Sequence, residues 1–441
     1  MKRKVSNSKQ RISVRMRLVA AFVISVLLSF VVGILSNLAA TYIAPKFENQ
    51  PKLIYTALGI TFFLSLPITV YLFLKSLPKD DESSNSLMTL ATQIPDMPEQ
   101  AFIGRETFVG EIMAALRDPN GKWIVAIDGM GGIGKTALAA KVAKQCLSEK
   151  LFDAVVWEKA ASKDGIQNQQ SSEPSLNFEM VLNSIAEQLG VRDILKLDFE
   201  DKKARIGVLL RTQRVLIVLD NLETAGIFGN EVEHQNSLAN QLRSLLNPSK
   251  AILTSRYRFE GELYRIRLTG LDRTDALRLI RQKAEHDNIL RVKEAGDEEI
   301  EPIISETGGS PLALKLVVGQ LDYLDLKLVL EKLREVRLPP GDIDENEYIR
   351  FYKFIFLRSW KLLSKDAQKL LISMRRFEPG VGGTRDAIAR VSRLNDDELT
   401  SNIEELLRLS FLEVGKSRSL KEQLRYYLHQ LTKNFVLSDL L

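Results

Sequence analysis

The chain has 441 residues, of which 45% are hydrophobic and 27% are charged. This is an ordinary globular composition, and the length exceeds that of one ordinary domain. The single cysteine, Cys146, excludes a disulfide framework within the chain and favours a reducing compartment, and we predict it as a small buried core residue. The net charge of +5 does not indicate a nucleic-acid-binding protein, because the first 17 residues carry seven basic residues and no acidic one.

Two charge-free segments, residues 18–44 and 53–74, follow this basic tail. Each is as long as a membrane-spanning helix, which needs about 20 apolar residues. A cleaved signal peptide has a much shorter apolar core, and a buried hairpin in a soluble protein has polar faces. We therefore predict a transmembrane hairpin over residues 18–75. The basic tail places the N-terminus in the cytoplasm, and two spans return the rest of the chain there.

Small or polar residues recur at every fourth position of the first segment, which allows a second helix to approach closely. They are Ser25, Ser29, Gly33 and Asn37. Packing against the second segment of the same chain and dimerisation in the lipid both remain open. Residues 76–97 are polar, lack periodicity and end near prolines, so we predict a linker there.

A phosphate-binding loop is predicted at residues 129–136, GMGGIGKT. A mostly apolar strand, residues 122–128, precedes it, and an alanine-rich helix follows. Strand, G-x-x-x-x-G-K-T and helix in this order form a P-loop, whose backbone amides surround phosphate oxygens. Lys135 is expected to reach the β- and γ-phosphates, and the Thr136 hydroxyl to ligate Mg²⁺.

Two further buried strands end in polar residues that suit the same site. RVLIVLD ends at Asp220, whose carboxylate is expected to hold the Mg²⁺, and AILTSR ends at Arg256, which we expect to sense the γ-phosphate. No guanine-reading motif is present, which argues against a GTPase. No second acidic residue directly follows Asp220, so we expect weak ATP hydrolysis at most.

The C-terminal third is predominantly helical in pattern until PPG at residues 339–341. Beyond it, a helix capped by Ser364, a helix leading into a strand, and a second strand predict a winged-helix domain. The candidate recognition helix carries Asp396, Asp397 and Glu398. Such a face repels phosphates, so we do not expect DNA binding.

The ordered set of motifs resembles the NB-ARC group of STAND nucleotide switches, which includes plant disease-resistance receptors. FIGRE (102–106) resembles the group's entry motif, and the P-loop, LIVLDN, ILTSR and GGSPLAL (308–314) follow in the group's order. LHQL (428–431) lies where the group carries Met-His-Asp, with Gln430 in place of the aspartate. In members of this group a ligand-sensing repeat array commonly follows the winged helix, and none follows Leu441. A separate protein or the hairpin is therefore expected to sense the stimulus.

The resemblance implies where an adenine nucleotide binds. Ile103 and Arg105 are expected along the adenine, Pro311 against it, and His429 at the ADP β-phosphate. The remaining expected cofactor contacts belong to the P-loop. They are Gly129, Met130, Gly131, Gly132, Ile133, Gly134, Lys135, Thr136 and Ala137.

The sequence therefore predicts a membrane-anchored ATP/ADP switch in signalling, with Mg²⁺ and with homo-oligomers in the ATP state. The predicted fold class is an α/β P-loop NTPase with a parallel sheet between helices, followed by a helical subdomain and a winged helix. The predicted boundaries are a tail (1–17), hairpin (18–75), linker (76–97), P-loop domain (98–270), helical subdomain (271–340) and winged-helix domain (341–441). The alternatives are a continuously cycling AAA+ ATPase and a membrane-tethered winged-helix transcription regulator.

Overall fold

The computed structural model describes residues 94–95, 102–160, 176–225, 230–336, 345–377, 381–416 and 424–440. The chain divides into two compact units, residues 1–86 and 87–441, and all described residues belong to the second. The predicted basic tail, the hairpin with its stripe of small residues, and almost all of the predicted linker lie outside the described residues.

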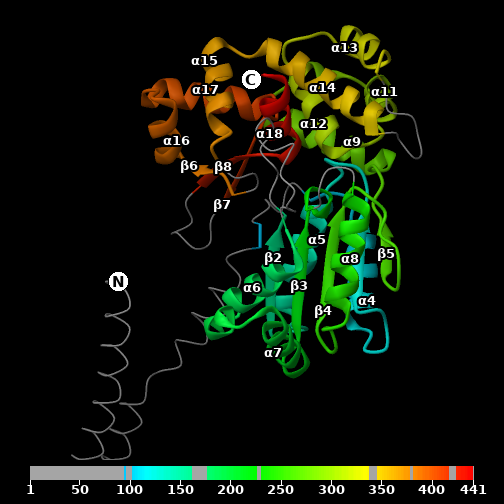
Figure 1. Ribbon diagram of the computed structural model, residues 1–441. Helices are drawn as coiled ribbons and strands as arrows, with labels where there is room; N and C mark the ends of the chain where they lie inside the picture. Colours follow the sequence, from blue (N-terminus) through cyan, green and yellow to red (C-terminus); the bar gives the residue numbers. More distant parts are fainter. Residues whose placement is uncertain are drawn as a thin grey trace, which may run out of the picture. The chain divides into compact units, whose positions relative to one another are not determined.

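The first part of the described unit is a five-stranded parallel sheet with strand order β2-β3-β4-β1-β5 (Figure 1). Its strands are β1 (Ile124–Asp128), β2 (Ala154–Lys159), β3 (Val215–Asp220), β4 (Lys250–Ser255) and β5 (Tyr264–Arg267). Its helices are α4 (Glu106–Arg117), α5 (Lys135–Ser148), α6 (Phe178–Gln188), η5 (Arg192–Lys196), α7 (Phe199–Thr212), η6 (Leu222–Thr224) and α8 (Glu231–Arg243). The α/β P-loop fold predicted from the sequence is confirmed.

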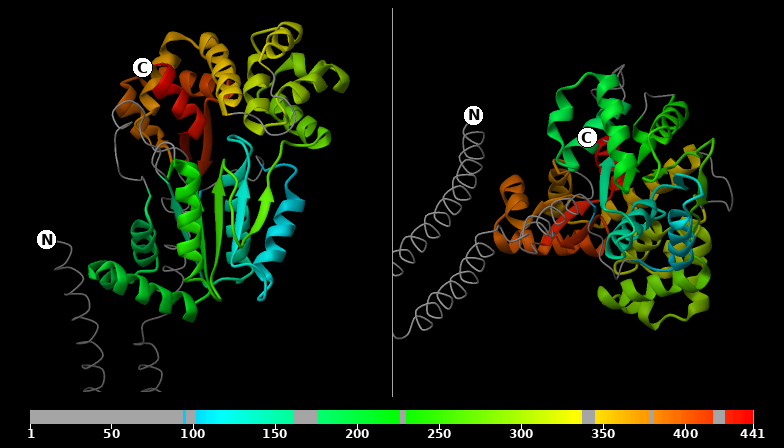
Figure 2. Two further views of the ribbon diagram at one scale, coloured as in Figure 1. Left: turned by 45° about the vertical axis from the view of Figure 1, so that its right-hand side comes forward. Right: turned by 90° about the horizontal axis from the view of Figure 1, so that it is seen from below.

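Both faces of strands β1 to β4 are largely buried, as the continuous apolar runs predict. Alternate strand residues point to opposite faces. Ile124 and Ile217 pack into the core shared with α6, α7 and α8, whereas Val125 and Val218 pack into the core shared with α4 and α5. Cys146 on α5 is fully buried in the second core, as predicted. Figure 2 shows the helices on the two sides of the sheet.

The helices α9 to α18 gather at the end of the sheet where the P-loop lies (Figure 1). A first group comprises α9 (Arg273–His286), α10 (Leu290–Glu294), α11 (Asp297–Glu306), α12 (Pro311–Gln320) and α13 (Leu326–Leu333). The rest comprises α14 (Glu345–Leu362), α15 (Lys365–Met374), β6 (Gly383–Thr384), α16 (Arg385–Ser392), α17 (Asp396–Arg408), β7 (Leu412–Lys416), β8 (Leu424–Leu428) and α18 (Gln430–Asp439). One continuous apolar core holds both groups together.

Several predicted features of this region are confirmed individually. The Ser364 hydroxyl accepts a hydrogen bond from the backbone of Ala367 and caps α15. The predicted acidic helix is α17, which runs into β7, and β7 pairs antiparallel with β8 in a three-stranded sheet with β6. The domain boundaries written for the whole chain stay predictions.

The predicted localisation in a cell membrane is corrected. Among the residues that the structure describes, no helix is long and apolar enough to cross a bilayer. The longest described helix, α14 with 18 residues, packs only one face against the protein core, so charged residues occur throughout its sequence. The segments that suggested the membrane, residues 18–44 and 53–74, lie outside the described residues. The lipid partner inferred from them is withdrawn with the localisation.

Candidate nucleotide-binding site

The P-loop connects β1 to α5, as the sequence predicts. Its glycines adopt backbone angles that other residues rarely take: φ is 72° at Gly132 and 103° at Gly134, the residue before α5. Gly134 thereby lets the loop enter the helix with the free backbone N–H groups of the first turn directed at the loop. An anion is stabilised at such a helix N-terminus.

Lys135 begins α5, and its side chain lies over the loop. The ammonium donates hydrogen bonds to the carbonyl oxygens of Gly129 (2.7 Å) and Met130 (3.0 Å). Burial lowers the pKa of Lys135, and the nearby carboxylates of Glu223 and Asp220 oppose that shift. A buried cation held over a loop of backbone amides is suited to bind phosphate oxygens.

Thr136 and Asp220 lie together, as the sequence predicts for a Mg²⁺ site. The Thr136 hydroxyl lies 2.9 and 3.1 Å from the two carboxylate oxygens of Asp220, and Thr254 on β4 donates to the same carboxylate at 2.6 Å. Asp220 is fully buried, and burial raises its pKa. A buried carboxylate whose anionic form is costly fits a cation beside it.

The described residues contain no group of three or more acidic, histidine or cysteine side chains that could hold a metal alone. Mg²⁺ fits the pair of Thr136 and Asp220 nevertheless, because it commonly takes few protein ligands and completes its shell with water and substrate phosphates. The residues present are therefore consistent with Mg²⁺ held together with a nucleotide.

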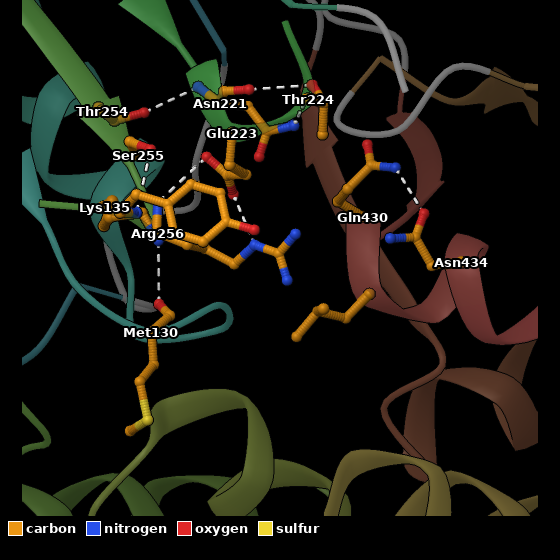
Figure 3. A network of polar contacts seen from close by, with 12 residues as sticks. Met130, Lys135, Asn221, Glu223, Thr224, Thr254, Ser255, Arg256, Gln430 and Asn434 are labelled. Atoms are coloured by element: carbon orange, nitrogen blue, oxygen red, sulfur yellow. Dashed lines mark hydrogen bonds and ion pairs between the residues drawn. The ribbon is translucent and has the colours of Figure 1, made fainter. Parts of the chain in front are cut away.

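Arg256 follows β4 at the same edge of the sheet. Its Nε lies 3.3 Å from one carboxylate oxygen of Glu223, and its backbone N–H donates to the other at 3.2 Å. Figure 3 shows Arg256 between Glu223 and the helix that carries Gln430. The sequence identified Arg256 but not Glu223 as a site residue. The turn that places Glu223 at the site depends on the left-handed backbone of Asn221 (φ 69°). This turn was not predicted from the sequence.

Ile103 and Arg105, the two predicted site residues of the entry motif, differ from each other in their surroundings. Ile103 is buried in the apolar core of the C-terminal helices. Arg105 is 5% exposed, and its guanidinium donates to the backbone carbonyls of Ile133 in the P-loop (3.2 Å) and Thr269 (2.7 Å). Burial lowers its pKa, while Asp275 and Asp272 oppose the shift. Arg105 thus ties the loop to the segment that follows β5.

The P-loop is also in contact with the C-terminal helices. The backbone N–H of Leu312 donates to the Gly132 carbonyl at 3.3 Å, which places the start of α12, with Pro311 as its first residue, on the loop. The Tyr352 hydroxyl of α14 lies 2.6 Å from the Ser310 hydroxyl and 3.5 Å from the Gly131 carbonyl oxygen. Neither tyrosine nor serine was expected at the site.

His429 lies at the start of α18, and its Nδ1 accepts a hydrogen bond from the backbone of Leu431 at 3.1 Å. Burial lowers its pKa to about 4, and the cations Lys159, Lys315 and Lys135 act in the same direction against Glu413. The ring is therefore neutral at physiological pH, and with Nδ1 as an acceptor its proton is on Nε2. Leu431, two residues after His429, lies against the P-loop, since a Cβ at Gly131 would lie 3.2 Å from its Cδ1.

The remaining predicted loop residues fall as follows. Ile133 is fully buried in the core behind the sheet, Met130 is partly buried between two cores, and Ala137 lies in the first turn of α5. Gly129 leaves no room for a side chain, since a Cβ there would lie 2.4 Å from the Leu268 carbonyl oxygen. Their contacts with a nucleotide stay predictions.

Comparisons with known proteins show what the chain is similar to. Two curated relatives are the transcription activator GutR of Bacillus subtilis (24% identical, 66% of this chain, 35% of that protein) and disease resistance RPP8-like protein 3 of Arabidopsis thaliana (24%, 68% and 32%). This chain thus spans about a third of these relatives. A solved STAND protein with a tetratricopeptide repeat sensor, from Pyrococcus horikoshii, aligns with 78% of this chain and 43% of its own at 21% identity and a TM-score of 0.47.

One family model matches part of the chain. Residues 105–289 match the family described as the NB-ARC domain. This range begins at Arg105 and contains the P-loop, Asp220 and Arg256, which the structure brings to one edge of the sheet. This part of the chain is therefore similar to the NB-ARC domain.

Proposed function

We propose that this chain is an ATP/ADP-dependent switch of the STAND type that acts in signalling and hydrolyses ATP slowly at most. In this proposal, the P-loop and Lys135 bind the phosphates, Thr136 and Asp220 hold Mg²⁺, and Arg256 reads the γ-phosphate. Pro311 packs against the adenine and His429 contacts the β-phosphate of ADP. Mg²⁺ supplies charge neutralisation between the phosphates when it is bound.

One observation carries the proposal: the P-loop is in direct contact with the C-terminal helices. Leu312 donates to the Gly132 carbonyl, and Tyr352 reaches the Gly131 carbonyl. A ligand shifts a two-state equilibrium only through contacts that differ between the states. A nucleotide in the loop would make such contacts on both sides, with the sheet and with the helices.

The C-terminal elements have the order expected of a winged helix, and we assign that role to α15, α16, α17 and the β6-β8-β7 sheet. In the proposal this domain closes on the nucleotide domain in the ADP state through His429 and opens in the ATP state. Opening would expose surfaces for homo-oligomerisation and for a protein sensor or effector.

One relative, GutR, is a transcription activator, which supports a second candidate: control of transcription through the same switch. Direct DNA binding by α17 is disfavoured, because its first turn carries Asp396, Asp397 and Glu398. A role in transcription through a protein partner is compatible with the switch.

The proposal is tested on the full-length chain with ATP and ADP in the presence of Mg²⁺. Calorimetry measures binding, sedimentation measures oligomer size, and phosphate release measures hydrolysis. We expect both nucleotides to bind, slow turnover, and larger assemblies with a non-hydrolysable ATP analogue than with ADP. Rapid sustained hydrolysis would support the cycling AAA+ alternative, and failure to bind either nucleotide would overturn the switch.

A further inference from the structure

Glu223 lies three residues after Asp220, and a turn after β3 places it at the nucleotide site. β3 ends at Asp220, Asn221 turns the backbone with φ 69°, and η6 then carries Glu223. The turn is fixed by a hydrogen bond from the Asn221 backbone to the Thr254 hydroxyl at 2.9 Å. The Glu223 side chain is 5% exposed, so its carboxylate is fixed in a largely dry environment.

The carboxylate makes two contacts with the same residue, Arg256. One oxygen accepts the Arg256 backbone N–H at 3.2 Å, and the other lies 3.3 Å from Nε of its guanidinium. In Figure 3, Glu223 lies above the Arg256 side chain, and the guanidinium extends beyond it toward the helix of Gln430. Contact with both the main chain and Nε restricts the rotamers that Arg256 can adopt.

The burial of the Glu223 carboxylate is offset by its contacts with Arg256. A buried carboxylate is costly unless cations and hydrogen-bond donors surround it. Here Arg256, the residue after β4, supplies both the cation and a backbone N–H donor.

We propose that Glu223 is the positioning residue that fixes Arg256 for recognition of the terminal phosphate of a nucleoside triphosphate. The inference rests on the proposed function and deepens it. Glu223 engages the Nε side of the guanidinium, and an arginine recognises phosphate through its planar fork of N–H donors. Holding the side chain in advance lowers the entropy lost on binding, so Glu223 strengthens binding of ATP and not of ADP.

Calorimetry on the full-length chain with Mg²⁺ measures the ATP and ADP affinities of Glu223→Ala, Arg256→Ala and the double variant. We expect each single change to weaken ATP binding about tenfold, the loss typical of one hydrogen bond to a charged group, and to change ADP affinity less than about twofold. The double variant should lose little more than Arg256→Ala alone, because the two residues act as one unit.

Glu223→Gln tests the contact between Glu223 and Arg256 without creating a cavity. The amide oxygen can still accept one hydrogen bond, so ATP affinity should fall between those of the wild type and Glu223→Ala. This variant carries the test if Glu223→Ala does not fold. Glu262→Gln is the matched control, because Glu262 pairs with Arg243 at 2.9 Å on the exposed surface of the same domain.

The outcomes separate the two proposals. If the wild type binds neither nucleotide, the proposed function fails. If it binds both but Glu223→Ala and Glu223→Gln weaken ATP and ADP equally, or if the losses from Glu223 and Arg256 add, the positioning role is wrong. A direct role of Glu223 as a base would instead lower the hydrolysis rate with unchanged ATP affinity, which also overturns it.

Discussion

The hydroxyl oxygens of Tyr352 and Ser310 lie 2.6 Å apart, and both groups reach carbonyl oxygens of the P-loop. Tyr352 belongs to α14 and Ser310 immediately precedes α12, so one small network joins three parts of the chain. Burial raises the pKa of Tyr352, which keeps its hydroxyl protonated and able to donate.

Tyr352→Phe should therefore weaken the contact between the P-loop and α14 while it leaves the aromatic packing in place. The loss of a buried hydroxyl contact costs about 1 kcal/mol. We expect a lower urea midpoint of unfolding, measured on the full-length chain. Tyr264→Phe is the control, because Tyr264 is 39% exposed on β5. Equal midpoints for the two variants would show that the network contributes nothing to stability.

Lys135→Ala should abolish nucleotide binding, because a point charge over the P-loop is lost and backbone amides cannot replace it. Calorimetry with ATP and with ADP measures the effect. Lys141→Ala is a matched control, since Lys141 lies on the same helix and is exposed. If Lys135→Ala retains near wild-type affinity for both nucleotides, the phosphates bind elsewhere.

The sequence predicted the site where short apolar runs end in polar residues. β1, β3 and β4 are buried on both faces, so their sequences are continuous apolar segments. The polar residues Asp128, Asp220 and Ser255 mark in the sequence where these strands end. β5 was not predicted, because three of its four residues are exposed at the edge of the sheet and its sequence, YRIR, is mostly polar.

The residues missed at the site depend on tertiary contacts. Glu223 is brought to Arg256 by one left-handed residue, Asn221, and Tyr352 by the packing of α14 on the P-loop. Local periodicity carries neither fact. In contrast, the proximity of Thr136 and Asp220 could be predicted, because the start of the helix after β1 and the carboxyl end of β3 lie at the same edge of the parallel sheet. Their role as Mg²⁺ ligands stays a prediction.

Asp220→Asn should have opposite effects on stability and on binding. Burial raises the pKa of Asp220 above its unfolded value, so the folded state binds this proton more tightly. Stability from this group is therefore present at low pH and is lost as the pH rises through the folded pKa, and the anion is unfavourable at neutral pH. Without nucleotide, the variant should unfold at a higher urea concentration than the wild type.

With Mg²⁺ the same variant should bind ATP more weakly, because an amide is a poorer ligand for a hard cation than a carboxylate. Calorimetry with and without Mg²⁺ separates the two effects. A variant that is less stable without nucleotide would show that Asp220 is stabilised in the fold by its hydroxyl donors, Thr136 and Thr254. An unchanged Mg²⁺ dependence would place the metal elsewhere.

His429 should make the stability of the chain sensitive to mild acid. Its folded pKa of about 4 lies below the usual value of 6.5, so the folded state binds this proton less tightly than the unfolded state. The stability that the neutral ring contributes is complete above the unfolded pKa and is lost as the pH falls from 6.5 toward 4.

The test compares urea midpoints of the wild type and His429→Gln at about pH 7 and about pH 5, on either side of the unfolded pKa. Glutamine does not titrate, so the variant should lose less stability on acidification than the wild type. The other titrating groups are common to both proteins and cancel in the comparison. Identical pH dependence would mean that protonated His429 is accommodated in the fold, and that Glu413, the carboxylate that opposes the shift, compensates the nearby lysines.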